Sequence, residues 1–96
     1  MHRRSWKRIE SKIAASLGGK RIPVNGRKGP DVAHPWLSPE VKARKDLPAY
    51  LWEWLAQAQD GAGDKLPVVV MHKAGRPHNE DLILLRLSDF VEWFGE

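Results

Sequence analysis

Two carboxylates and a lysine lie within a stretch of twelve residues in the first half of the chain. Asp31 ends the sequence Gly29-Pro30-Asp31, and Glu40 and Lys42 form a Glu-x-Lys sequence shortly after it. Carboxylate oxygens are the ligands that Mg²⁺ and Mn²⁺ prefer, and such an ion beside a phosphate promotes its hydrolysis. These residue types therefore predict a divalent metal site that cuts a phosphodiester.

The Glu-x-Lys sequence lies in a segment, Leu37 to Arg44, that is predicted to be a strand. Alternate side chains of a strand share one face, so Glu40 and Lys42 should point the same way and Val41 should point into the opposite layer. An alternative interpretation is an ordinary surface salt bridge between the two charged side chains, which is common on sheets. An isolated Glu-x-Lys sequence does not separate the two interpretations.

Asp31 begins a second short strand, predicted from Asp31 to His34. A turn near Pro35-Trp36 would bring Asp31 opposite Glu40. Two neighbouring carboxylates repel each other, and a divalent cation with oxygen ligands removes that cost. Pro39 directly precedes Glu40, which predicts an edge strand or a bulge at this point.

A third carboxylate, Glu10, lies in a helix predicted from about Arg3 to Leu17, which Gly18-Gly19 ends. Apolar residues recur at helical spacing in this segment, and a helical wheel places Glu10 on their stripe. A carboxylate on a buried face is costly unless a cation compensates it. The compensating cation could be a metal ion or, equally well, a nearby Lys or Arg.

The bulk composition is that of a small globular domain. The chain has 96 residues, of which 42% are hydrophobic, and it contains no cysteine. This length predicts one domain over residues 1–96, and the absence of cysteine excludes disulfides and thiolate zinc sites. No apolar run approaches the length of a membrane span, and we expect no secretory signal. The four histidines show no recurrent metal-binding spacing and are predicted to lie on the surface or in loops.

The pattern of turn residues and apolar runs predicts the element order α-β-β-β-α-β-β-α. After the segments named above, it predicts a helix from an Asp46 cap to about Gln59, then a strand from Leu66 to His72. A strand from Leu82 to Leu87 and a short helix capped by Ser88 follow a polar loop. We expect an α/β fold in which helices flank one small mixed β-sheet.

Positive charge is concentrated in the first half of the chain. Residues 1–45 carry twelve Lys and Arg against three acids, whereas residues 46–96 carry four against nine. A basic half of this kind predicts a nucleic acid partner, although a solvated basic face is the plainer alternative. The candidate DNA contacts are Arg3, Arg4, Lys7, Arg8, Arg27, Lys28, Arg44 and Lys45.

Taken in order, Glu10 in the first helix, Gly29-Pro30-Asp31 and Glu40-Val41-Lys42 resemble the PD-(D/E)XK nuclease superfamily. Within this superfamily, the chain resembles the small archaeal and phage Holliday-junction resolvases. The resemblance implies a restriction-endonuclease-like core and a Mg²⁺-dependent endonuclease, with Mn²⁺ as a substitute ion. It also implies a homodimer on branched or duplex DNA, in the cytoplasm of a prokaryotic, archaeal or phage-infected cell.

The same resemblance assigns roles to individual residues. Asp31 and Glu40 would be metal ligands with help from the Val41 carbonyl, and Glu10 would reach the metal directly or through water. Lys42 would position or activate the attacking water, and Gln57 on the following helix could line the site. Two alternatives stay open: a nuclease on flaps or other DNA, as in virus-type replication-repair nucleases, and a DNA-binding module without catalysis.

Overall fold

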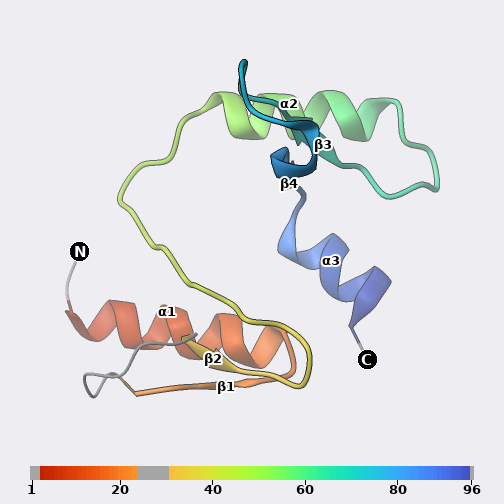
Figure 1. Cartoon of the computed structure of the whole chain (residues 1–96). Coiled ribbons are helices and arrows are strands. Elements are labelled where there is room, and N and C mark those ends of the chain that lie inside the picture. The colour runs from red at the N-terminus through yellow and green to blue at the C-terminus, as the bar shows by residue number, and fades with distance from the viewer. Residues whose placement is uncertain (1–2, 24–30, 96) are drawn as a thin grey trace. The chain divides into compact units, whose positions relative to one another are not determined.

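The computed structural model describes residues 3–23 and 31–95 of the chain, with side chains from Trp6 onward. The chain divides into two compact units, Met1–Asp46 and Leu47–Phe94, which we refer to as the first and the second unit. Each unit has its own secondary structure (Figure 1). The single domain predicted for residues 1–96 stays a prediction. No helix in the described part of the chain is long and apolar enough to cross a membrane.

The first unit consists of a helix and a short β-ribbon. Helix α1 (Arg3–Ser16) is followed by strands β1 (Lys20–Arg21) and β2 (Val32–Ala33), which pair antiparallel. The predicted helix is confirmed to within one residue at its C-terminal end. Strand β2 is shorter than the predicted strand from Asp31 to His34.

The core of the first unit forms where the apolar side of α1 meets β2. Ala14, Val32 and Val41 are buried there, and Ile9 and Ile13 pack against them. Ile9 and Ile13 belong to the apolar stripe that the helical spacing predicted. Val32 is completely buried, so the short β2 strand contributes the centre of this core.

Two glycines turn the chain from α1 into β1. Gly18 has a φ of 78°, a conformation that glycine adopts without steric cost. The Gly19 N–H donates to the Ala14 carbonyl at 2.8 Å, which closes the end of the helix. A Cβ on Gly19 would overlap the Ala33 carbonyl oxygen, so only glycine allows the ribbon to approach here.

The segment after β2 turns back on itself around His34. The His34 Nδ1 accepts hydrogen bonds from the backbone N–H groups of Trp36 and Leu37. Because Nδ1 is an acceptor, Nε2 carries the proton and donates to the Leu17 carbonyl at 2.7 Å. The turn predicted near Pro35-Trp36 is therefore present, and His34 ties it to the end of α1.

The third strand predicted for this unit, Leu37 to Arg44, is not formed. The segment runs beside β2, and the Asp31 N–H donates to the Pro39 carbonyl at 2.9 Å. Pro39 has no N–H with which to donate a second ladder bond to β2. The Val41 N–H, two residues later, donates to the side-chain oxygen Asp31 Oδ2 and not to a backbone carbonyl. A ladder cannot continue where a carboxylate replaces the backbone carbonyl.

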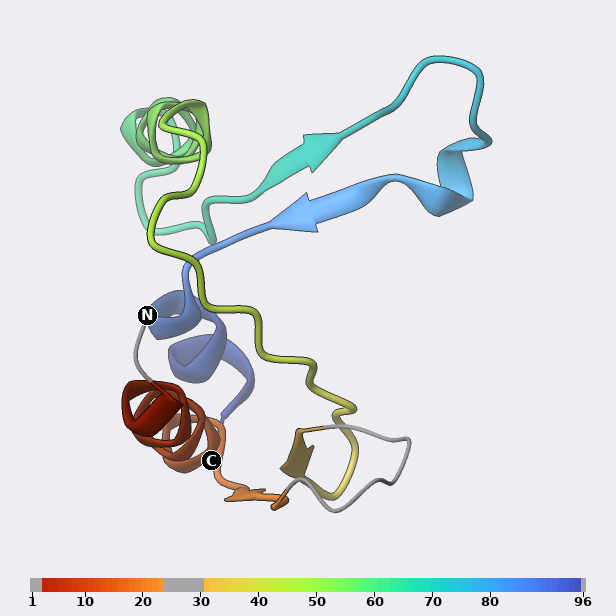
Figure 2. The same ribbon diagram turned by 90° about the vertical axis from the view of Figure 1, so that its left-hand side faces the viewer.

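The second unit consists of two helices and a hairpin. Helix α2 (Tyr50–Asp60) packs against strand β3 (Val69–Met71), and β3 pairs antiparallel with β4 (Leu82–Leu84). Figure 2 shows the two strands side by side, with the short 3₁₀ helix η1 (His78–Glu80) at the far end of the hairpin. Helix α3 (Leu87–Phe94) ends the unit.

The caps predicted for α2 and α3 are wrong. Helix α2 begins at Tyr50 with Ala49 as its cap residue, because Pro48 disfavours helical backbone in the residue before it. Asp46 therefore lies too early in the chain to cap the helix. Ser88 lies inside α3, whose first turn is already closed by the bond from the Phe90 N–H to the Arg86 carbonyl.

The chain is a mixed α/β structure, as predicted, but its strands do not form one mixed sheet. Among the described residues, β1 pairs with β2 and β3 pairs with β4, and both pairs are antiparallel. The described element order is α-β-β-α-β-β-α with η1 before β4. The difference from the predicted order is the missing strand at Leu37 to Arg44.

Candidate active site

Asp31 lies directly against the Glu-x-Lys segment. Its N–H donates to the Pro39 carbonyl at 2.9 Å, and its Oδ2 accepts the Val41 N–H at 2.6 Å. These two bonds involve the residues on either side of Glu40. The first two members of the predicted site, separated by nine residues in the sequence, are therefore neighbours in the structure.

Side chains alternate in direction along Glu40, Val41 and Lys42, as they do in an extended segment, although these residues form no strand. The Val41 side chain is buried in the core of the first unit, whereas Glu40 and Lys42 are exposed. Lys42 Nζ lies 3.2 Å from Glu40 Oε1. The predicted alternation is thus confirmed, and the salt bridge weighed as the alternative is also present.

Glu10 has an arginine as its partner. Arg21 Nε donates to Glu10 Oε2 at 2.7 Å, and the two side chains are only 18% and 12% exposed, respectively. The wheel prediction of an inward-facing Glu10 is confirmed, and Arg21 is a compensating cation from β1. Whether Glu10 also reaches a metal ion stays a prediction.

The structure describes most, but not all, of the basic residues that were predicted to contact DNA. Lys7 and Arg8 are exposed on α1, and Arg3 and Arg4 belong to the same helix. Arg44 and Lys45 are exposed beyond the Glu-x-Lys segment, and the Arg44 guanidinium lies 5.8 Å from the centroid of the Trp6 ring. Arg27 and Lys28, together with Gly29 and Pro30, lie outside the described residues.

Gln57 belongs to the second unit. It lies on α2, where its side chain is exposed. An exposed glutamine near the middle of a helix is ordinary, so its assignment to the site rests on the resemblance alone.

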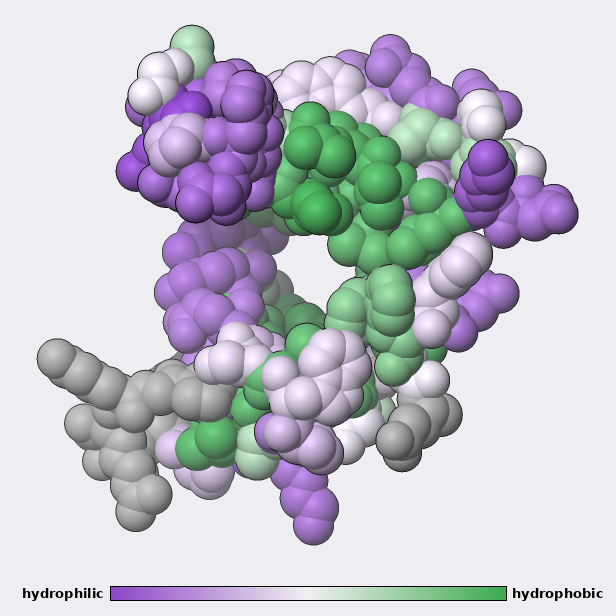
Figure 3. Space-filling view, turned by 45° about the vertical axis from the view of Figure 1, so that its right-hand side comes forward, coloured by the Kyte–Doolittle hydropathy of each residue, from purple (hydrophilic) through white to green (hydrophobic). Residues whose placement is uncertain are grey.

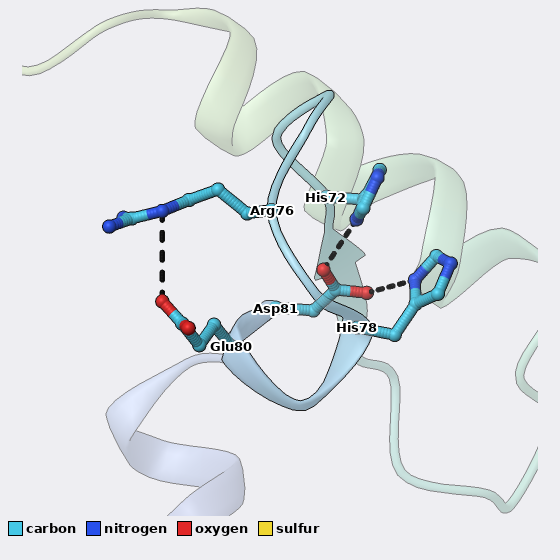
Figure 4. A network of polar contacts seen from close by, with 5 residues as sticks. All are labelled: His72, Arg76, His78, Glu80 and Asp81. Atoms are coloured by element: carbon cyan, nitrogen blue, oxygen red, sulfur yellow. Dashed lines mark hydrogen bonds and ion pairs between the residues drawn. The ribbon is translucent and has the colours of Figure 1, made fainter.

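One polar cluster was missed by reasoning from the sequence. His72, His78 and Asp81 converge at the far end of the hairpin in the second unit (Figure 4). Their separations in the sequence match no familiar metal motif. The signal that could have found two of them is the hairpin register, because Met71 faces Leu82 and the next pair outward is His72 with Asp81.

Comparison with known proteins adds no relative. No protein-family model matches the chain, and no curated protein or solved structure is significantly similar to it. The resemblance to PD-(D/E)XK nucleases therefore depends on the residues themselves and on how they are arranged.

Proposed function

We propose that the protein is a metal-dependent DNA endonuclease with a restriction-endonuclease-like core, which nicks four-way junctions by hydrolysing phosphodiester bonds. The observation that carries the proposal is the pair of hydrogen bonds from Asp31 to Pro39 and Val41. They hold Asp31 against the backbone on either side of Glu40, and a PD-(D/E)XK site would need these two residues to be neighbours.

The residue types in this segment suit a hard divalent cation. Asp31 uses Oδ2 for the Val41 N–H, and its other carboxylate oxygen can bind a cation at the same time. Glu40 is exposed and offers a second carboxylate from the adjacent segment. Asp31 and Glu40, with the Val41 carbonyl, would hold Mg²⁺ or Mn²⁺. The ion would neutralise charge on the phosphate and lower the pKa of a bound water.

Lys42 and Glu10, the other two charged residues of the proposed site, would contribute charge and orient groups around it. Lys42 keeps its ammonium within 3.2 Å of Glu40, so it is placed to orient a water or a phosphate oxygen beside that carboxylate. Glu10 is held by Arg21 through a short ion pair, which fixes its carboxylate on the inward side of α1. A contribution of Glu10 through a water molecule fits this arrangement better than direct coordination.

The basic surface would hold the DNA backbone. Lys7, Arg8, Arg44 and Lys45 are exposed in the first unit, whose sequence is strongly basic. Such side chains bind phosphates with little regard to base sequence, and the affinity falls as salt rises. This kind of contact suits an enzyme that recognises the shape of branched DNA.

A second candidate function is a DNA-binding module that does not cut. The Glu40–Lys42 and Glu10–Arg21 ion pairs favour it, because they already compensate two of the three carboxylates without a metal. A third possibility keeps the nuclease chemistry and changes the substrate to flaps, duplex or single-strand-containing DNA.

A cleavage assay separates these functions. With Mg²⁺ and labelled four-way junction, flap and linear duplex, we expect the wild-type chain to nick the junction preferentially. Asp31→Asn and Glu40→Gln should abolish cutting and retain junction binding. Asp46→Asn is the matched control, because it removes an equal charge from an exposed residue close by and should leave cutting unchanged.

Each of the other outcomes has a definite meaning. Junction binding without cleavage of any substrate supports the binding module. Equal cutting of all three substrates excludes a junction-specific enzyme. Normal cutting by Asp31→Asn or Glu40→Gln shows that the active site lies elsewhere in the chain.

A further inference from the structure

The far end of the hairpin in the second unit gathers two imidazoles around one carboxylate. His72 Nδ1 lies 2.6 Å from Asp81 Oδ1, and His78 Nδ1 lies 3.1 Å from Asp81 Oδ2. The two rings stack, with centroids 4.4 Å apart and an angle of 28° between their planes. One ligand atom from each of the three residues can be chosen so that all lie within 4.8 Å of one another.

The backbone around the hairpin turn places these side chains. His72 follows β3 and Asp81 precedes β4, so the register that pairs Met71 with Leu82 makes them the next pair outward. The 3₁₀ helix η1 then folds His78 back toward Asp81, whose N–H donates to the His78 carbonyl at 3.0 Å. The cluster is therefore built by the hairpin itself.

We propose that His72, His78 and Asp81 form a binding site for Zn²⁺, separate from the Mg²⁺ site proposed above. Zn²⁺ binds imidazole nitrogens at about 2.0–2.1 Å and carboxylate oxygens at about 2.0–2.2 Å, in tetrahedral geometry. Ligand atoms around such an ion are separated by about 3.4 Å, which follows from these bond lengths. The distances of 2.6 Å and 3.1 Å are to different oxygens of Asp81, and one ligand atom from each residue lies within 4.8 Å of the others. Each separation therefore has to change by less than about 1.5 Å to reach the value around zinc.

The ligand set distinguishes Zn²⁺ from Mg²⁺. Two nitrogen donors with one oxygen suit zinc and its neighbours in the first transition series, whereas Mg²⁺ prefers oxygen throughout. Three protein ligands leave the fourth tetrahedral position to water. Asp81 is 15% exposed, whereas His72 and His78 are 39% and 84% exposed, so an ion can enter from solvent without rearrangement of a core.

The rest of the hairpin end does not compete for the ion. Glu80 is turned toward Arg76, with 3.6 Å between its Oε1 and the arginine Nε, and points away from the two histidines (Figure 4). Asp81 at present accepts hydrogen bonds from the ring nitrogens. Binding of the ion would replace any protons held between these groups, since imidazole and carboxylate bind metal only in deprotonated form.

Zinc would cross-link the two strands at the end of the hairpin. It would join the residue after β3, the residue before β4 and the first residue of η1 through one ion. A ligand that binds only the folded chain raises its stability by an amount that grows with the logarithm of the ligand concentration above the dissociation constant. We therefore expect Zn²⁺ to raise the melting temperature of the full chain, and Mg²⁺ at the same concentration to leave this hairpin unaffected.

The test is a calorimetric titration of the untagged full chain with ZnCl₂. We expect one site per chain that is weakened at least tenfold by His78→Ala and by Asp81→Asn. Glu80→Gln is the matched control, because it removes the same charge from the adjacent residue and should bind Zn²⁺ as the wild type does. His78 is largely exposed, so its substitution by alanine leaves the fold intact, which circular dichroism checks.

Three results would overturn the proposal. The first is the absence of Zn²⁺ binding in the titration, and the second is unchanged binding in both His78→Ala and Asp81→Asn. The third is an equal loss in Glu80→Gln, since general charge would then explain the affinity. None of these readouts depends on DNA cleavage, so the zinc site stands or falls independently of the nuclease.

Discussion

At the scale of single residues, the carboxylates of the first unit differ in what already surrounds them. Asp31 accepts a hydrogen bond from a backbone N–H. Glu10 forms an ion pair with an arginine and is nearly buried, and Glu40 forms an ion pair with an exposed lysine. Separating a carboxylate from a close, buried partner destabilises the fold, whereas an exposed carboxylate can exchange its partner with little loss of stability. Asp31 and Glu40 are therefore better placed than Glu10 to take up a metal ion.

The Glu10–Arg21 pair should stabilise the fold measurably. Glu10→Gln removes the charge that compensates a nearly buried guanidinium, so we expect a loss of about 1–3 kcal/mol in the free energy of unfolding. In a double-mutant cycle with Arg21→Gln, the two losses should not add, since the residues are in contact. Urea unfolding followed by circular dichroism measures each value.

The Glu40–Lys42 pair provides the control for this prediction. It is the same kind of ion pair, but its side chains are 56% and 65% exposed. Solvent-exposed pairs contribute little, so Glu40→Gln should change the free energy of unfolding by less than about 0.5 kcal/mol. Equal losses at Glu10 and Glu40 would show that the Glu10–Arg21 pair does not hold α1 to β1.

At the scale of elements, the junction between α1 and β1 depends on two glycines for different reasons. Gly18 has a positive φ, and a Cβ placed on it would meet no atom within 4 Å. A Cβ on Gly19 would overlap the Ala33 carbonyl oxygen and lie 2.8 Å from Val32 Cγ1. Gly18→Ala should cost about 1–2 kcal/mol through backbone strain. Gly19→Ala should cost about 3 kcal/mol, because the obstructing atom is backbone and cannot move aside.

Substitution by asparagine distinguishes backbone strain at Gly18 from steric overlap at Gly19. It tolerates the left-handed conformation better than alanine, so Gly18→Asn should recover part of the stability that Gly18→Ala loses. Gly19→Asn should recover nothing, because its Cβ meets the same carbonyl. Denaturant midpoints of the four variants decide the matter, and recovery at Gly19 would contradict the predicted contact.

At the scale of the whole molecule, the second unit exposes an unusual amount of apolar surface. Val70 and Ile83 face each other across the hairpin and are 62% and 63% exposed. Leu82, which points to the opposite face of the hairpin, is 65% exposed. Figure 3 shows hydrophobic residues gathered on the face of the molecule that it draws. Apolar patches of this kind mark association surfaces on small proteins.

We therefore expect the homodimer that cutting both strands of a junction requires, since two active sites must be held at a fixed separation. Analytical ultracentrifugation at micromolar concentration should show a dimer. Ile83→Lys should shift it toward monomer, because a charge would be buried in the interface. Asn79→Lys adds the same charge at an exposed polar position and should leave the dimer intact. A monomer at every concentration would contradict the prediction.

The sequence was sufficient for features that depend on local spacing. The 3.6-residue period placed α1 and the inward face of Glu10, and the two glycines placed the end of the helix. The alternation of side chains placed Val41 on the face opposite to Glu40 and Lys42. These features follow from backbone geometry within a few residues of each other. The charge difference between the two halves was likewise visible in the residue types alone.

Only the tertiary structure decided which groups meet across the chain. It made Arg21 the partner of Glu10, gave the Val41 N–H to the Asp31 carboxylate in place of a third strand, and joined His72, His78 and Asp81. Each of these contacts joins residues that are neighbours through a turn or a register. The sequence limits such pairings but does not select one, because a side chain and a backbone carbonyl can satisfy the same N–H equally well.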